Sequence, residues 1–280
     1  MTIVQDVLLL QAPSVDCAQE RDHINFLNSS LERFGVVKID IGFEDDQCRY
    51  LEQVIRNLHQ YHGHGLPIDH SATRGWFWDI RPMAPVKQED DSTASNSSVP
   101  RDQARSETAR DFPWHTDCSY ESSPPRYFAL QVLQNDRCGG GTLSILNVER
   151  LLGHLSEASR SSLYHPEYSI SVPPEFIKNE GQRQIVGSIL CDDENGNTGL
   201  RFREDIFTPL TKAAASAIEE LKSVLSGPEI EEEILHLHSE YMSRGSIILV
   251  DNRKWLHARN EVKDPERHLR RVRWDACAFR

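Results

Sequence analysis

Three residues that can bind a metal ion come from two segments that lie far apart in the chain. His115 and Asp117 are separated by one residue, and His257 follows His115 by 142 residues. A metal site needs these side chains close together, so the intervening chain must return to its starting point. A gap of this length holds enough strands to close a jelly roll. The pattern therefore predicts a mainly β fold with a double-stranded β-helix (jelly-roll, cupin-like) core and flanking helices.

The spacing His-x-Asp/Glu is weak evidence when taken alone. With 12 histidines and 43 acidic residues in 280, about two such triplets arise by chance, and triplets occur at 115–117, 165–167 and 238–240. The triplet at 165 contains Pro166, which favours a turn. The triplet at 238 lies 19 residues before His257, which leaves no room for a barrel between them. The triplet at 115 is therefore the candidate.

The segment that contains His257 is the more specific part of the pattern. Residues 245–257 read as a glycine turn, a continuous apolar strand, a polar turn and a second strand. Ten residues later, alternation places Arg267, Arg271 and Arg273 on one face of the last strand. Arginines that face a barrel interior are unfavourable unless anions lie there. A solvated basic edge strand is the alternative, and the histidine upstream favours the anion site.

These residue types indicate one kind of chemistry. Two histidines and a carboxylate are the ligand set of non-haem Fe(II) oxygenases, which leave three coordination positions open. A downstream arginine can hold the far carboxylate of 2-oxoglutarate, because a guanidinium is planar, always charged and bidentate. Five segments carry a family pattern: 112–120 (FPWHTDCSY), 124–130 (PPRYFAL), 139–143 (GGGTL), 251–259 (DNRKWLHAR) and 267–271 (RHLRR). Over roughly residues 110–280 the chain thus resembles the TauD/TfdA (taurine dioxygenase-like) and clavaminate synthase-like family of Fe(II)/2-oxoglutarate-dependent dioxygenases.

The resemblance implies a role for each matching residue. His115, Asp117 and His257 would bind Fe(II), and Thr142 and Arg267 would bind 2-oxoglutarate. Arg271, the second arginine of the Arg-x-x-x-Arg pair, would contact an acidic group of the substrate. Further candidates for contact with an anionic substrate are Arg126, Arg203 and Arg259.

Composition excludes several other classes of protein. The net charge of −12 argues against a nucleic-acid surface and against anionic membranes. No apolar run is long enough to span a bilayer, and the six cysteines show no Cys-x-x-Cys pair. We therefore expect a cytoplasmic protein with reduced thiols and a small-molecule substrate, with no nucleic-acid or membrane partner; a homo-oligomer stays open.

The chain reads as a single domain over residues 1–280. Helices are predicted at 18–34, 45–62 and 211–226, with strands at 36–41 and 76–82 and a short strand at 201–203. A polar insertion at about 86–110 cannot bury enough surface to order itself, and we expect a flexible loop at the mouth of the site. Two further features of the sequence each allow two structural interpretations. The histidines at 59, 62, 64 and 70 form either a metal patch or an exposed loop, with the loop favoured, and Trp76 and Trp78 line either a substrate pocket or the core.

The function that follows is an oxidation driven by 2-oxoglutarate and dioxygen. The expected reaction oxidises, most simply hydroxylates, an anionic or zwitterionic small molecule such as an amino or organic acid, with release of succinate and CO2. Desaturation, cyclisation and epimerisation stay open, as does the setting, secondary metabolism or catabolism. The alternatives are a catalytically silent metal-binding member of the fold, and a metal-dependent hydrolase.

Overall fold

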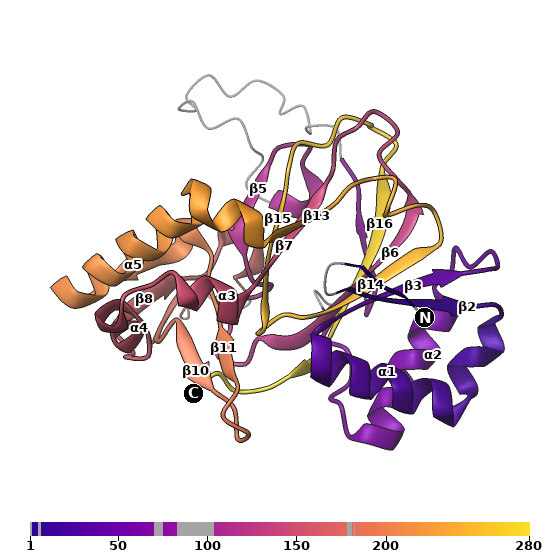
Figure 1. The fold of residues 1–280 in the computed structure, drawn as a ribbon, viewed down its shortest axis with the longest axis horizontal. Coiled ribbons are helices and arrows are strands. Elements are labelled where there is room, and N and C mark those ends of the chain that lie inside the picture. Colours follow the sequence, from indigo (N-terminus) through magenta and orange to yellow (C-terminus); the bar gives the residue numbers. More distant parts are fainter. Residues whose placement is uncertain (1, 5–6, 70–74, 83–103, 178–180, 182) are drawn as a thin grey trace.

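The fold is built around a seven-stranded sheet (Figure 1). The structure is a computed structural model, and it describes residues 2–4, 7–69, 75–82, 104–177, 181 and 183–280. In spatial order the strands are β1 (Thr2–Val4), β2 (Val7–Ala12), β3 (Val36–Ile41), β14 (Ser246–Asp251), β6 (Pro125–Gln134), β16 (His268–Ala276) and β4 (Trp78–Ile80). Strands β2 and β3 pair in parallel, and the other neighbours are antiparallel.

A four-stranded antiparallel sheet faces the central strands of the large one. Its spatial order is β13 (Ile234–Leu237), β7 (Leu143–Asn147), β15 (Trp255–Arg259) and β5 (Phe112–His115). One apolar cluster joins the two sheets, since it contains Phe128 and Ile248 from the large sheet and Leu143 and Ile145 from the small one. The metal-ligand candidates therefore lie between two packed sheets.

Two amphipathic helices cover the outer face of the large sheet (Figure 1). They are α1 (Arg21–Phe34) and α2 (Arg49–His62), which follows the loop after β3. Their apolar stripes, which include Leu27 and Leu58, pack on Ile247 of β14. Helix α1 ends at Gly35 with a φ of 71°, and a Cβ at that position would lie 2.6 Å from the indole nitrogen of Trp255. Only glycine fits this turn.

The chain between β7 and β13 forms a separate layer beside the small sheet, with its own apolar core. It contains α3 (Val148–Gly153), α4 (Glu157–Leu163), β8 (Tyr168–Ser171), β9 (Gln184–Gly187), β10 (Leu190–Asp192), β11 (Thr198–Leu200), β12 (Phe207–Pro209) and α5 (Lys212–Leu225). Short 3-10 turns complete the chain: η1 (Val15–Gln19), η2 (Arg105–Glu107), η3 (Pro174–Phe176), η4 (Glu204–Ile206) and η5 (Pro228–Glu233).

Most of the predicted elements are present, with shifted ends. Helix 18–34 begins at Arg21 after a 3-10 turn, and helix 45–62 begins at Arg49, because the Asp45 carboxylate accepts hydrogen bonds from the backbone N–H groups of residues 49 and 50. The predicted strand at 201–203 is wrong, since only Arg203 pairs, in an isolated bridge to His115. The strand at 76–82 is confined to Trp78–Ile80.

Part of the predicted insertion at 86–110 lies outside the described residues, which resume at Ala104. Residues 104–110 contain η2 and lead directly into β5. Within the described part of the chain, no helix is both long and apolar enough to cross a membrane.

Candidate metal centre and its two chambers

Strand pairing brings the two histidines together. In the β5–β15 ladder His115 lies directly opposite His257, and their rings are 4.1 Å apart. The Asp117 Oδ1 atom lies 3.9 Å from His115 Nε2 and 3.8 Å from His257 Nε2. All three residues are buried, and they form the one group of three or more potential metal ligands found among the described residues. The sequence prediction therefore corresponds to one compact cluster.

Backbone hydrogen bonds fix where Asp117 points. The side-chain amide of Asn252 accepts from the Asp117 N–H at 2.7 Å and donates to the Asp117 carbonyl at 3.0 Å. The neighbouring Thr116 exchanges hydrogen bonds with Phe202. Since β5 ends at His115, the next residues are free to leave the strand, and Cys118 has a φ of 55°. Asp117 thus turns back toward the histidines.

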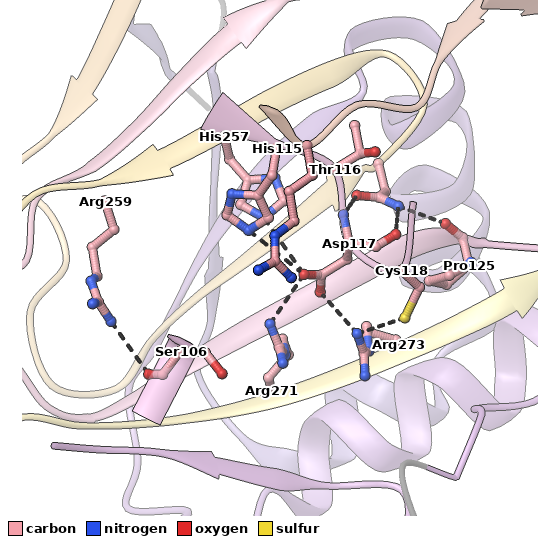
Figure 2. A network of polar contacts seen from close by, with 12 residues as sticks. Ser106, His115, Thr116, Asp117, Cys118, Pro125, His257, Arg259, Arg271 and Arg273 are labelled. Carbon is pink, nitrogen blue, oxygen red and sulfur yellow. Dashed lines mark hydrogen bonds and ion pairs between the residues drawn. The ribbon is translucent and has the colours of Figure 1, made fainter. Parts of the chain in front are cut away.

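Two arginines from β16 lie beside the Asp117 carboxylate (Figure 2). Arg271 Nη1 donates to Oδ1 at 3.1 Å, and Arg273 Nη1 lies 3.8 Å from Oδ2. Burial favours the neutral acid, but these two cations and His257 outweigh it and hold the pKa of Asp117 well below its usual value. The Asp117 side chain is therefore an anion, as a metal ligand must be.

The surroundings of the His115 imidazole also favour metal binding. Burial first, and then the neighbouring His257, lower its pKa well below the usual value, which keeps the ring neutral. Its Nδ1 atom lies 2.8 Å from the carbonyl oxygen of Pro113, a contact that places the proton on Nδ1 and leaves Nε2 free to bind a metal. The ring also stacks on Phe112 at 3.6 Å.

One chamber runs from the histidines to Arg267. Its walls are largely apolar and include Phe128 and Leu143, and Arg267 lines it with only 5% of its surface exposed. Burial and the nearby Arg259 guanidinium lower the pKa of Arg267 to about 9, against a small opposing effect of Asp136. Its Nη1 atom has no hydrogen-bond partner within the described ranges. A buried, unsatisfied guanidinium in an apolar chamber is suited to an anionic ligand.

A glycine makes room for that guanidinium. Gly141 has a φ of +65°, and a Cβ there would lie 2.7 Å from Arg267 Nε. Gly141 is therefore required by close approach as well as by backbone conformation.

A second chamber opens on the other side of Asp117. It is lined by Ser119, Tyr120, Phe176, Arg105, Arg203 and Arg273, and it shares Phe112, His115 and Arg271 with the first chamber. A roomier cavity elsewhere, lined by Arg126, Asp251 and Arg253, contains none of the metal-ligand candidates. We assign the chemistry to the two chambers because they meet at His115.

The remaining candidate site residues from the sequence, Thr142, Arg259 and Arg126, lie in three different positions relative to the metal site. The Thr142 hydroxyl lies 3.3 Å from His238 Nδ1, and Thr142 is absent from the lining of the Arg267 chamber, so its role stays a prediction. Arg259 donates to the carbonyls of residues 106, 108 and 110 and so anchors the segment before β5. Arg126 lies away from the site and pairs with Asp251.

The histidines and tryptophans for which two interpretations were open lie in different surroundings. His64 is buried, contacts Asn28 at 2.8 Å and stacks on Tyr127 at 5.0 Å, so it belongs to the core, while His70 lies outside the described residues. Trp78 adjoins the site, where its indole donates to Glu107 and Arg271 lies over its ring at 5.6 Å.

Sequence reasoning missed the roles of Asn252 and Arg273. Asn252 occurs in the polar turn before His257, and Arg273 was placed on the correct face of β16 without a partner. Alternation carried the signal for Arg273, but nothing local to Asn252 indicates that it would bind Asp117. Cys118 is buried, and its sulfur accepts a hydrogen bond from Arg273 Nη1 at 2.7 Å.

Comparisons with known proteins identify the family of the chain. Residues 19–273 match the family described as "Taurine catabolism dioxygenase TauD, TfdA family". The L-asparagine oxygenase of Streptomyces coelicolor is 26% identical over 148 residues, which are 53% of this chain and 41% of that relative, so the alignment spans less than half of the relative.

Two solved structures share the fold. Asparagine oxygenase in complex with Fe(II), 2S,3S-3-hydroxyasparagine and succinate has a TM-score of 0.65 at 20% identity, over 92% of this chain and 82% of that one. A mutant of the non-heme iron oxygenase OrfP in complex with (3S)-hydroxy-L-Arg has a TM-score of 0.66 at 16% identity, over 94% and 84%. Because the family match extends over most of the sequence, the chain belongs to the TauD, TfdA family of dioxygenases.

Proposed function

We propose that this protein is an Fe(II)- and 2-oxoglutarate-dependent dioxygenase that oxidises an amino acid or a related anionic or zwitterionic small molecule. The observation that carries the proposal is the position of Arg267, a buried guanidinium without a hydrogen-bond partner for Nη1 in the described chain, in the same chamber as His115 and His257. Family membership and the names of the relatives, which act on asparagine and carry hydroxy-arginine, support it.

The donor set fits iron. Two imidazoles and one carboxylate are the ligand set of non-haem iron sites. Asp117 Oδ1 lies 3.9 and 3.8 Å from the two imidazole nitrogens, and one ligand atom of each residue lies within 4.8 Å of the others. His115, Asp117 and His257 would therefore hold the ion where the two chambers meet.

Arg267 would hold the far carboxylate of 2-oxoglutarate. The apolar walls of its chamber exclude water from the chain of the cosubstrate and strengthen the ion pair. When bound, iron and 2-oxoglutarate supply the oxidising power, using dioxygen and releasing succinate and CO2. The protein's own part is to position the reactants and to keep the site dry.

Arg271 would orient the substrate. It reaches both chambers, and its Nη1 atom already contacts Asp117 at 3.1 Å. A substrate carboxylate on the remaining nitrogens of Arg271 would lie close to the metal, which favours oxidation near that carboxylate. Hydroxylation is the simplest outcome at such a site.

The proposal extends to the topology of the core. Strands β4, β6, β14 and β16 lie in the large sheet and β5, β7, β13 and β15 in the small one, so the chain crosses between sheets at almost every step. This order supports a double-stranded β-helix, with the layer between β7 and β13 inserted into a single domain over residues 1–280.

An anaerobic titration tests the proposal. Metal-free protein would be titrated with Fe(II) and then with 2-oxoglutarate, while the weak visible charge-transfer band of the chelated cosubstrate is recorded. We expect the band in the wild type, loss of iron binding in Asp117→Ala, and iron binding without the band in Arg267→Met. Iron binding without a band in the wild type would remove the 2-oxoglutarate assignment and leave a silent metal site or a hydrolase.

A further inference from the structure

Arg267 lies just before β16, so its position depends on the loop that leads into that strand. We call residues 260–267 the arginine loop, and residues 135–142, which contain the glycine run, the glycine loop. The two loops are joined by backbone contacts, since the Gly141 N–H donates to the Glu261 carbonyl at 2.8 Å. What holds the two loops together therefore also determines where Arg267 lies.

One buried carboxylate, that of Asp136, binds both loops. Its Oδ1 atom accepts from the backbone N–H groups of residues 138 and 140 at 2.9 and 3.1 Å, and its Oδ2 atom accepts from those of residues 263 and 264 at 2.8 and 3.2 Å. Only 2% of Asp136 is exposed. Burial favours the neutral acid, but the four N–H groups outweigh it and hold the pKa of Asp136 below its usual value. Asp136 is therefore an anion that links two loops.

Two hydrogen bonds lead from this carboxylate to the backbone of Arg267. The Asp264 N–H donates to Asp136 Oδ2, and the Asp264 carbonyl accepts from the Arg267 N–H at 3.1 Å. The side chain of Arg267 is held from the same direction. A Cβ at Gly141 would lie 3.4 Å from Asp136 Cβ and 2.7 Å from Arg267 Nε, so Asp136 packs behind the glycine that the guanidinium approaches.

Asp136 holds Arg267 without occupying its guanidinium. Both carboxylate oxygens of Asp136 accept from backbone N–H groups, and Arg267 Nη1 has no hydrogen-bond partner among the described residues. The charge of Asp136 still acts on Arg267, because it opposes the lowering of the arginine's pKa by burial and by Arg259. The guanidinium is thus fixed in place, charged and available to a ligand in the chamber.

We propose that Asp136 is a positioning residue that holds Arg267 at one distance from the metal and so selects 2-oxo dicarboxylates by chain length. Under the proposed function, on which this inference rests, one end of the cosubstrate binds at the metal and the far carboxylate binds Arg267. A ligand held at both ends must match the distance between its two anchors. 2-Oxoadipate is one methylene longer than 2-oxoglutarate, so Arg267 would have to retreat to bind it, and the linked loops oppose that movement.

Binding of the two diacids to the Fe(II)-loaded protein tests this under anaerobic conditions, with the charge-transfer band as the signal. The wild type should bind 2-oxoglutarate at least about tenfold more tightly than 2-oxoadipate. Asp136→Asn keeps the shape but directs an amide N–H2 toward backbone N–H groups, which releases one loop. It should raise the dissociation constant of 2-oxoglutarate about tenfold and that of 2-oxoadipate by less than about threefold, with Fe(II) binding unchanged.

Gly140→Ala perturbs the same contact without altering a charge. A Cβ at that position would lie 2.7 Å from Asp136 Oδ2 and 2.5 Å from the Glu261 carbonyl oxygen, so it should separate the loops and reduce the same preference. Asp45→Asn is the matched control, because Asp45 is also buried and accepts from two backbone N–H groups, but lies before α2 and outside both chambers. It should destabilise the protein and leave the preference as in the wild type.

The outcomes separate this inference from the proposed function. A wild type that binds both diacids alike, an Asp136→Asn protein that loses both in equal proportion, or a changed preference in Asp45→Asn would overturn the role of Asp136 and leave the dioxygenase assignment intact. If Asp136→Asn does not fold, Gly140→Ala decides. If neither diacid gives the band in the wild type, the proposed function fails first. A preference that falls in both variants, with Fe(II) binding unchanged, supports both.

Discussion

Replacing Arg267 with methionine should stabilise the ligand-free protein and abolish its response to 2-oxoglutarate. Burial and Arg259 lower the pKa of Arg267 from 12.5 to about 9, which corresponds to on the order of 5 kcal/mol against the charged form. For a base with a lowered folded-state pKa, this unfavourable contribution is fully present below pH 9, and hence at neutral pH. Methionine keeps the length and the apolar contacts, so we expect a net gain of ~1–3 kcal/mol in the free energy of unfolding.

The assay is chemical denaturation at pH 7.5, with and without Fe(II) and 2-oxoglutarate under anaerobic conditions. At a hundred times its dissociation constant, the cosubstrate should stabilise the wild type by about 2.7 kcal/mol and Arg267→Met by nothing. Arg201→Met is the control, since Arg201 is also buried but donates to the carbonyl oxygens of Ser188 and Glu121. Its loss should destabilise the protein and leave the ligand response intact. Destabilisation of Arg267→Met by as much as Arg201→Met would refute the reasoning, because Arg267 would then be a structural residue.

Three further predictions address the surroundings of the site. Arg273→Met removes a cation that lies 3.8 Å from Asp117 Oδ2 and helps to keep that carboxylate ionised, so it should weaken Fe(II) binding about tenfold or more in an anaerobic titration, with Arg273→Lys intermediate. Gly141→Ala would place a Cβ 2.7 Å from Arg267 Nε and should raise the dissociation constant of 2-oxoglutarate at least about tenfold, whereas Gly139→Ala, with a φ of +74° and nothing within 4 Å, should not. Burial lowers the pKa of His64 to about 4, so stability should fall by roughly 3 kcal/mol as the pH drops from 6.5 to 4. In urea denaturation, His64→Gln should flatten this dependence; an unchanged slope would contradict it.

The residues that sequence alone placed correctly share a physical reason. Regular alternation places Arg271 and Arg273 on the same face of β16, and both lie beside Asp117. Arg267 precedes β16 and a register shift at 268/269, yet it lines the same chamber as Arg271. The apolar run of β14 predicted a buried central strand, and His257 lies in the middle of the next strand, β15, in the facing sheet. Local periodicity was sufficient to predict β14 and β16 because each of them pairs with a neighbouring strand on both sides.

The residues that sequence did not place depend on neighbours distant in the chain. Asn252 holds Asp117 across 135 residues of sequence, and any asparagine in a polar turn has the same local signal. Arg203 reads as part of an alternating strand, but its partner is a single residue of β5 and its side chain is directed by Asp205. Such roles follow from tertiary contacts and have no periodicity that a sequence could display.

Thr142 is the position where the family resemblance and the contacts of this chain differ most. The resemblance predicts a hydroxyl that binds 2-oxoglutarate, but Thr142 Oγ1 lies 3.3 Å from His238 Nδ1, and it is the next residue, Leu143, that lines the Arg267 chamber. Valine has the same shape without the hydroxyl, and one neutral hydrogen bond is equivalent to about fivefold in affinity. We expect Thr142→Val to bind 2-oxoglutarate within about twofold of the wild type, as measured by the charge-transfer band. A loss of about fivefold or more would mean that the hydroxyl turns from His238 to the cosubstrate on binding, and the role implied by the resemblance would then be correct.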